Sequence, residues 1–406
     1  MLERLYPRSS MATRLRSNPL GAYVDGFAEV LSNQGYSPDV LREKLSAVGK
    51  LGRWLSEQKI PISSLDEHYL DEFLGQTRSG PFHAAAEQIL EHLRQLGVVA
   101  RLPLEPDRRP TILREFEEYL ARERGIKPRS IRYQLDVAQQ FLVERFGSDG
   151  VFACGKLCTA DVTHFIERHA YAHKPATCQT MFSVLRSFLR FLYVRGETPT
   201  DLTGCVLRVA GWRLAALPTF LPPDQVEAVI RGVDGSVRSG RRDRAILLLL
   251  ARLGLRSGEV VNLVLEDINW EMGTISVKGK SAQHNCLPLP WDVGEAVADY
   301  LIHERPTCTW RNVFLRAIAP YGPMRAPGVL TCMVARRFRR VGLQPPKMGA
   351  RVLRHSLASR MLQDGNTLDE IRDILGHESH ATTEIYAKVA ITGLRELALP
   401  WPGAMP

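Results

Sequence analysis

Long apolar runs, paired cysteines and a secretory leader are what this 406-residue sequence lacks. Its longest apolar stretch, residues 245–255, is interrupted by Arg252 and is shorter than the roughly 20 residues that a membrane helix needs. The 7 cysteines are odd in number and scattered, and Cys154 and Cys158 have no second pair at zinc-binding spacing. These absences exclude a membrane span and a disulfide framework, and they predict a soluble protein of the reducing cytoplasm.

Basic residues are in excess. The chain has 53 Lys and Arg against 44 Asp and Glu, a net charge of +9, while its 45% hydrophobic and 24% charged residues are ordinary globular values. Wholesale disorder is therefore excluded, and the surplus favours an anionic partner, nucleic acid above all. Residues 1–20 carry four arginines among serine and proline, and they predict a loose basic tail.

Two stretches with apolar residues at helical spacing follow this tail. Residues 21–100 predict an extra N-terminal helical domain, and residues 110–198 predict a second helical domain after a proline-rich connector at 102–110. The two stretches also resemble each other at a nearly constant offset: Gly35 and Pro38 match Gly125 and Pro128, and Leu65 and Phe73 match Leu157 and Phe165. We interpret this as a degenerate duplication of a small helical module; two unrelated bundles are the alternative.

A third domain is predicted over residues 215–390, followed by a C-terminal tail at 391–406. Prolines before an apolar periodic run mark its first helix, and the most convincing strands of the chain lie inside it. Residues 274–277 and 285–289 flank a polar loop, and Gly273 closes a turn after residues 268–270. The fold class is therefore mainly α with a small antiparallel β-sheet.

Four short motifs in this third domain carry possible chemistry. Arg256 lies between a helix that ends at Gly254 and one that begins near Ser257, and Lys280 lies in the hairpin loop. Arg354 precedes His355 at the start of another helix. A capping box at residues 367–370 begins a helix that ends at Gly376, before His377, and Tyr386 follows nine residues later.

These motifs resemble the tyrosine recombinase, or phage integrase, family. Arg256 is similar to that family's first arginine box, Lys280 to its hairpin lysine, Arg354-His355 to its second arginine box, and residues 375–386 to its histidine and nucleophile boxes. The resemblance covers residues 217–389 well, and residues 112–196 are similar to the family's helical, SAM-like core-binding domain. It implies a C-shaped clamp on DNA, a reaction without metal or other cofactor, and assembly of four protomers on two sites.

The chemistry explains why these residue types occur together. Conserving a phosphodiester without added energy requires a covalent protein–phosphate ester, and the Tyr386 hydroxyl is a suitable nucleophile. Two guanidinium groups, Arg256 and Arg354, suit the charge that develops on the phosphate. Lys280 would protonate the leaving 5′ oxygen, and His377 would donate to the phosphate or handle the phenolic proton.

One position departs from the family pattern. The family usually has histidine three residues before the second arginine, and this sequence has Arg351 there. Arginine donates hydrogen bonds but cannot act as an acid or base near neutral pH. We expect Arg351 to replace only the hydrogen-bonding role, so that a catalytically impaired architectural or regulatory DNA-binding protein remains an alternative, as does a type IB topoisomerase.

Other basic residues suit phosphate contacts or are simply solvated. The candidates for DNA contact lie in both the second helical domain and the third domain: Arg129, Arg132, Arg186, Arg190, Arg241, Arg242, Arg336 and Arg340. The His377–His380 pair follows a helix break and has no third ligand nearby, so no metal site is expected. Taken together, the sequence predicts a site-specific recombinase of a mobile element, acting on double-stranded DNA, with possible sister recombinases.

Overall fold

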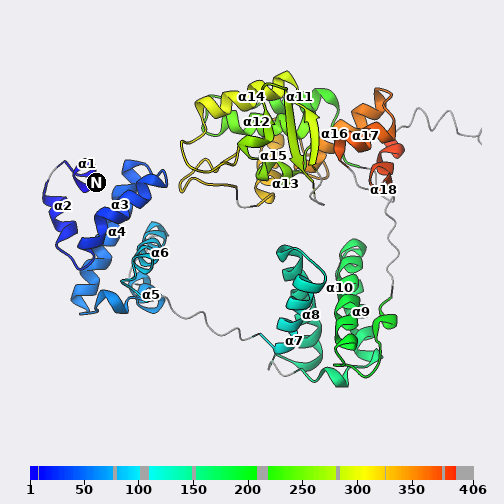
Figure 1. Cartoon of the computed structure of the whole chain (residues 1–406), viewed down its shortest axis with the longest axis horizontal. Helices are drawn as coiled ribbons and strands as arrows, with labels where there is room; N and C mark the ends of the chain where they lie inside the picture. The colour runs from blue at the N-terminus through cyan, green and yellow to red at the C-terminus, as the bar shows by residue number, and fades with distance from the viewer. Residues whose placement is uncertain are drawn as a thin grey trace, which may run out of the picture. The chain divides into compact units, whose positions relative to one another are not determined.

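The computed structural model describes residues 1–7, 9–75, 80–100, 109–148, 152–207, 218–279, 284–324, 326–376 and 380–389. The chain divides into two compact units, residues 102–215 and the remainder. Helices predominate throughout, and a single three-stranded sheet lies in the C-terminal part of the described chain (Figure 1). The fold class predicted from the sequence is confirmed.

The N-terminal module is a helical bundle with its own core. Its elements are α1 (Leu2–Leu5), α2 (Ser9–Arg16), α3 (Gly21–Asn33), α4 (Pro38–Glu57), η1 (Ile62–Ser64), α5 (Glu67–Gly75) and α6 (Gly80–Gln95). Apolar side chains on α3, α4, α5 and α6 form one continuous buried cluster. Proline at the first turn of α4 is well placed, because its missing N–H would be unpaired there in any case.

The prediction of a loose tail over residues 1–20 is wrong. Leu2, Leu5 and Leu15 from α1 and α2 are each at most 5% exposed and belong to the module's core. Arg16 forms an ion pair with Asp25 at 2.8 Å between Nη2 and Oδ2. The arginines dominate the composition of this segment, but its leucines are spaced so that both short helices bury one face.

The second module is also a helical bundle. It consists of α7 (Thr111–Glu118), the π-helical turn η2 (Tyr119–Glu123), α8 (Pro128–Phe146), η3 (Cys154–Lys156), α9 (Thr159–Ala172), α10 (Pro175–Val194) and η4 (Thr203–Cys205). Its buried cluster is rich in phenylalanine, with Phe116, Phe188 and Phe191 in mutual ring contact.

The two modules repeat the same local design, as the duplication hypothesis predicts. In each, a glycine with positive φ (Gly35 at 87°, Gly125 at 57°) precedes a helix that begins with proline. In each, a 3-10 turn then leads to a buried leucine, Leu65 or Leu157. The offset grows from 90 residues at Gly35 and Gly125 to 92 at Leu65 and Leu157, so the segment between these points is two residues longer in the second module.

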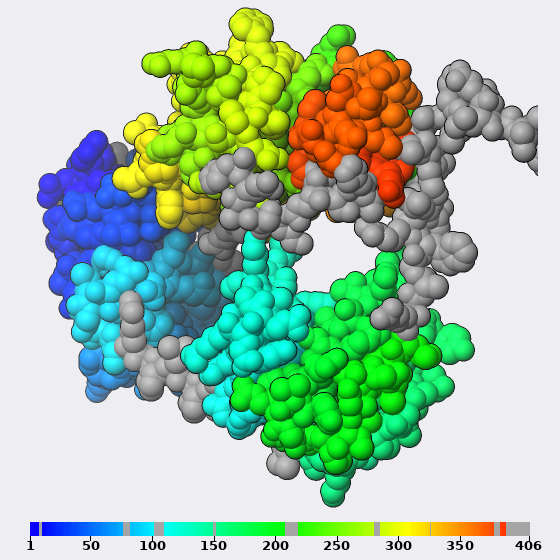
Figure 2. Space-filling model, turned by 45° about the vertical axis from the view of Figure 1, so that its right-hand side comes forward, coloured from blue at the N-terminus to red at the C-terminus, as the bar shows by residue number. Residues whose placement is uncertain are grey.

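The mixed domain follows. Its elements are α11 (Pro223–Arg231), α12 (Gly240–Arg252), α13 (Ser257–Asn262), η5 (Leu265–Asp267), β1 (Ile268–Asn269), β2 (Thr274–Lys278), β3 (His284–Pro288), α14 (Trp291–His303), α15 (Gly328–Arg340), α16 (Ala350–Gln363), α17 (Leu368–Leu375), α18 (His380–Thr383) and η6 (Glu384–Val389). Figure 2 shows the residues of α16 and α17, in orange, gathered on one side of this domain.

The long apolar run of the sequence is the buried helix α12, not a membrane span. Most of its side chains are buried, and it packs against α14 and α16. The sheet has the order β1-β2-β3 and is antiparallel, with Ile275 opposite both Ile268 and Leu287. The predicted hairpin is confirmed. Among the described residues, no helix is long and apolar enough to cross a membrane.

Two charged residues hold α12 to α15 inside this core. Asp243 and Arg337 are both buried, and Arg337 Nη2 lies 2.6 Å from Asp243 Oδ2. Truncating one partner would leave the other charge buried without compensation, at a cost of about 3–5 kcal/mol. The pair therefore fixes the frame on which α16 rests.

A smaller apolar cluster lies beyond α16. Ala358, Ile371 and Leu375 pack together with Tyr386. This cluster brings α16, α17 and η6 into contact. It therefore places a tyrosine of the last described segment against the helix that carries Arg354.

Candidate catalytic site

The mixed domain brings four of the six predicted catalytic residues into one region. Arg256 is the N-cap residue of α13, Arg351 and Arg354 lie on α16, and Tyr386 lies in η6. Lys280 and His377 are outside the described residues, and their roles stay predictions. The sequence predicted that Arg256 lies between two helices and that Arg354 lies on a helix, as the structure has them.

The two arginines are held by the backbone around α17. Arg354 Nη2 donates to Leu375 O at 2.6 Å, and Arg256 Nη2 donates to Gly376 O at 3.0 Å. Arg354 Nη1 also donates to Gly254 O at 2.5 Å. A guanidinium has five N–H donors, so each arginine keeps others for a ligand while its orientation is fixed.

Arg256 is further fixed by its own helix. Glu259 Oε2 accepts the Arg256 backbone N–H at 2.7 Å, and Glu259 Oε1 accepts from Nη1, also at 2.7 Å. The Arg256 side chain is 41% exposed, whereas Glu259 is largely covered. The hydrogen bonds therefore fix the orientation of the Arg256 guanidinium, while part of it stays exposed to solvent.

Two glycines, Gly254 and Gly376, allow the segments around the two arginines to pack closely. Gly254 has a φ of 62°, and a Cβ there would lie 2.6 Å from Leu375 Cδ2. Gly376 has a φ of 59° and ends α17, and a Cβ there would lie 2.4 Å from Asn285 Nδ2 of β3. Glycine is required at both positions by conformation and by space.

Arg354 is the buried member of the pair. It is 7% exposed, and burial, with the charge of Arg256 as a second cause, lowers its pKa to about 10. It therefore remains charged at neutral pH. A buried, preoriented guanidinium stabilises developing negative charge more strongly than an exposed one, because little solvent screens it.

Tyr386 lies with its hydroxyl against a histidine that the sequence analysis did not select. Tyr386 is 1% exposed, and its Oη lies 2.7 Å from His355 Nδ1. Burial raises the pKa of Tyr386 to about 12, against the opposing effect of Arg354, Arg351 and Arg256. Burial, then the charges of Arg351 and Arg354, lower the pKa of His355 to about 4.

At neutral pH, the phenol therefore donates and the neutral imidazole accepts. His355 is the base closest to the tyrosine among the described groups that contact it. Its signal in the sequence was its place directly after Arg354, which puts it on the neighbouring face of α16. The sequence did not show that Tyr386 would contact His355, because this contact depends on how η6 folds against α16.

Arg351 lies one turn before Arg354 and His355 on α16 and is exposed. Its charge lowers the pKa of His355 and opposes the rise in the pKa of Tyr386. These directions show that the Arg351 charge acts at the tyrosine–histidine pair. An arginine at this position therefore supplies charge but no proton transfer.

The predicted DNA-contact residues divide into exposed and engaged groups. Arg129, Arg132 and Arg190 are exposed on α8 and α10, and Arg336 and Arg340 are exposed on α15. Arg186 donates to Val206 O at 2.9 Å, and Arg241 is paired with Asp299.

Arg242 has a structural role that the sequence analysis did not foresee. Its side chain is only 12% exposed and is bonded to Asp243 and to Leu315 O. The prediction that Arg242 contacts DNA is therefore wrong, because its guanidinium nitrogens are hydrogen-bonded within the domain.

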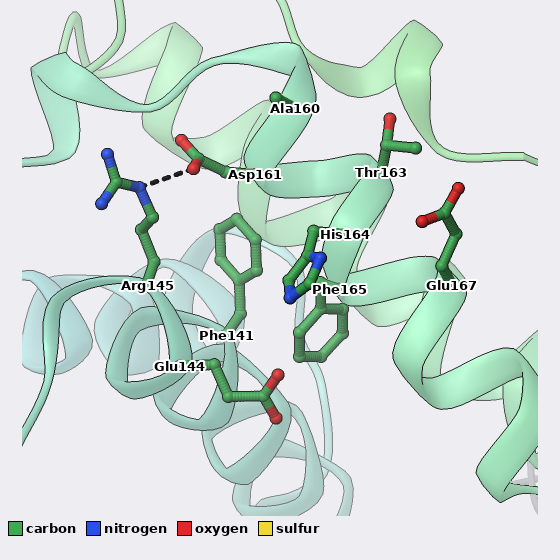
Figure 3. Close-up of a pocket in the computed structure, with 9 residues that line it drawn as sticks. All are labelled: Phe141, Glu144, Arg145, Ala160, Asp161, Thr163, His164, Phe165 and Glu167. Atoms are coloured by element: carbon green, nitrogen blue, oxygen red, sulfur yellow. Dashed lines mark ion pairs between the residues drawn. The ribbon is translucent and has the colours of Figure 1, made fainter.

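An open pocket of about 450 Å³ lies elsewhere, in the second module (Figure 3). It contains none of the predicted catalytic residues. Arg145 Nε and Asp161 Oδ1 form an ion pair at its edge at 2.6 Å, and Glu144 and Glu167 also line it. Three carboxylates against one arginine would repel a phosphate group. This pocket is therefore not a candidate for the catalytic site.

Comparisons with known proteins identify the family and the fold. Residues 219–392 match the profile of the Phage integrase family. The "Putative integrase/recombinase y4rA" of Sinorhizobium fredii is 38% identical over 96% of this chain and 97% of its own length.

Two solved structures share the fold. The XerH site-specific recombinase bound to palindromic difH substrate has a TM-score of 0.54 at 18% identity, over 95% of this chain and 96% of that one. A lambda integrase tetramer bound to a Holliday junction has a TM-score of 0.53 at 16% identity, over 76% and 87% of the two chains. By the extent and identity of the y4rA match, with the domain match and the fold, the chain belongs to the phage integrase family of tyrosine-type site-specific DNA recombinases.

Proposed function

We propose that this recombinase cuts and rejoins DNA through a covalent bond between Tyr386 and a 3′ phosphate. The observation that carries the proposal is the Tyr386 hydroxyl, 2.7 Å from a neutral histidine and within the electrostatic reach of Arg354, Arg351 and Arg256. A nucleophile, a base and the groups that stabilise charge are thereby gathered on α13, α16 and η6.

The cleavage step balances as a transesterification. His355 accepts the phenolic proton, Tyr386 Oη forms a bond to phosphorus, and the bond from phosphorus to the 5′ oxygen breaks. Lys280 returns a proton to that oxygen, and the two arginines hold the non-bridging oxygens. Attack by a 5′ hydroxyl of another strand reverses the step and completes the exchange. No net oxidation or hydrolysis occurs.

Tyr386 must move before it reacts. At 1% exposure its hydroxyl is closed to a phosphate, so the described arrangement is a resting state. DNA bound to Arg256 and Arg354 would compete for the region that covers the tyrosine. The expected consequence is that cleavage begins only after DNA binding has uncovered the Tyr386 hydroxyl while His355 stays within reach of it.

The assembly and the biological role are also proposals. The four-protomer arrangement implied by the family, together with the tetrameric lambda integrase structure, supports a tetramer on two duplexes held by clamp-like protomers. The tail at residues 391–406, which is outside the described residues, would contact a neighbouring protomer. Similarity to a putative integrase/recombinase supports integration or transposition of a mobile element.

The test is a nicked suicide duplex carrying the end of the encoding element. Wild type should form an SDS-resistant protein–DNA band, and Tyr386→Phe should not, although it binds the duplex equally well. Site-specific binding by wild type without any band would instead support the second candidate, an architectural DNA-binding protein. The observation that favours this second candidate is Arg351, which stands where the family usually has histidine.

A further inference from the structure

From α3 to α6 the N-terminal module follows the order of helices of the second module from α7 to α10, but the exposed side chains of the two modules differ. Between α6 and α10 the buried positions coincide: Ile89, Leu90 and Leu93 correspond to Phe188, Leu189 and Leu192, and all six are at most 3% exposed. Both helices are followed by a glycine with positive φ, Gly97 at 73° and Gly196 at 76°. Exposed positions can therefore be compared one by one.

The charges on the corresponding faces are reversed. Arg186 and Arg190, which the sequence analysis assigned to DNA, correspond to Glu87 and Glu91 on α6. On α4, Asp39 stands where α8 has Arg129. Arg42, which matches Arg132, has a side chain that is 44% exposed; its Nη1 lies 2.7 Å from Asp39 Oδ1, and its Nε donates to Leu5 O. This pairing offsets the charge of Asp39.

The same face has also lost its hydroxyl groups. Ser130 and Ser183 of the second module correspond to Val40 and Ala84, and Val40 is 36% exposed. Phosphate contacts come from basic side chains and from serine and threonine hydroxyls. A face that has exchanged both for carboxylates and small apolar groups repels DNA and is suited to protein contact.

A network of hydrogen bonds fixes this face. Lys44 Nζ of α4 donates to Gln88 Oε1 of α6 at 2.8 Å, and Gln88 Nε2 donates to Tyr36 Oη at 2.9 Å. Because Gln88 directly follows Glu87, the network holds α4 and α6 together beside the carboxylates. The acidic face is defined here as Glu43, Glu87 and Glu91, which are exposed on α4 and α6.

The distribution of charge along the chain favours a basic partner. Residues 1–101 contain as many basic as acidic residues, so the entire surplus of +9 belongs to the rest of the chain. We propose that the acidic face of the N-terminal module binds basic side chains that DNA leaves uncovered on a second copy of this chain, when both copies are bound to DNA. This inference rests on the proposed function, because DNA is what brings the copies together.

The experiment compares one binding site with two. The probe is a duplex that the full-length protein enriches from a random-sequence pool, used as a single site and as two inverted sites. The variant is Glu87→Arg/Glu91→Arg, and the matched control is Glu57→Arg, an exposed position at the other end of α4. Glu87→Gln/Glu91→Gln removes the charge with less perturbation.

We expect the double arginine variant to bind the single site as tightly as wild type or more tightly, and to lose about tenfold in cooperativity on two sites. The glutamine variant should lose less, and Glu57→Arg nothing. Weaker binding to the single site would overturn the proposal, since the face would then contact DNA. Unchanged cooperativity in both double variants would also overturn it. A covalent band on the same suicide duplex reports separately on the proposed function.

Discussion

The candidate catalytic site of the mixed domain contains a buried arginine, whereas the second helical module has exposed arginines on its helices. Arg354 is 7% exposed and donates to two backbone carbonyls, whereas Arg132 and Arg190 extend from helices into solvent. A buried guanidinium acts at one point with fixed geometry, and an exposed one adds attraction that salt screens. We therefore expect the buried arginine to act in DNA cleavage and the exposed arginines to contribute to the affinity for DNA.

The largest expected effect is at the buried arginine. Arg354→Ala should lower the rate of strand cleavage by about 100- to 1000-fold, because a preoriented donor to the phosphate is lost. Single-turnover cleavage of the suicide duplex measures this. Arg360→Ala is the control, since Arg360 is exposed on the same helix and pairs with Asp364. Equal losses in both variants would mean that helix stability, not charge, is responsible.

The tyrosine–histidine pair should give the next largest effect. His355→Gln should slow cleavage about 100-fold at pH 7, because the proton acceptor for the phenol is lost. Its rate should then rise with pH, since the pKa of Tyr386 is raised to about 12 and phenolate becomes the limiting species. A pH profile parallel to that of wild type would assign the base to another group.

The same histidine should make stability depend on pH. The pKa of His355 is about 4 when folded and 6.5 in an ordinary setting, so the unfolded chain binds more protons between these values. The free energy of unfolding should be highest well above pH 6.5 and should fall as the pH falls to 4. The full pKa difference corresponds to about 3 kcal/mol, and solvent screening of this partly exposed side chain reduces the expected fall to about 2 kcal/mol. Denaturant titrations of wild type and His355→Gln measure the difference. An equal fall in both would place the effect elsewhere.

The smallest expected effects are at the exposed arginines. Arg129→Ala and Arg132→Ala should each weaken DNA binding by about 1 kcal/mol and reduce the salt dependence by about one charge. Titrations at several salt concentrations measure both quantities. Cleavage at saturating protein should be unchanged. A change in cleavage without a change in salt dependence would contradict the division of roles between the two regions.

Much of this division could be predicted from the sequence. Proline at helix starts, glycine at helix ends and the capping box at Thr367 and Glu370 are local signals, and each lies where the structure has it. The arginines could be assigned because their motifs are local too. The contact between His355 and Tyr386 was not predictable, since it joins residues 31 apart through tertiary packing.

Predictions based on charge content were wrong where the burial of a segment depended on the spacing of its apolar residues or on its tertiary contacts. Residues 1–20 were expected to be loose because of their arginines, yet Leu2, Leu5 and Leu15 anchor them in the core. Arg242 was expected to face DNA, yet it is bonded to Asp243 and Leu315. In both cases, charge content gave no information about which atoms the fold covers.

The most direct test of the account is to identify the amino acid that carries the DNA. After nuclease digestion of the SDS-resistant complex, mass spectrometry of the tryptic peptides should find the nucleotide remnant on Tyr386, attached through its 3′ phosphate. A remnant on any other residue, or a 5′ linkage, would contradict the proposed mechanism.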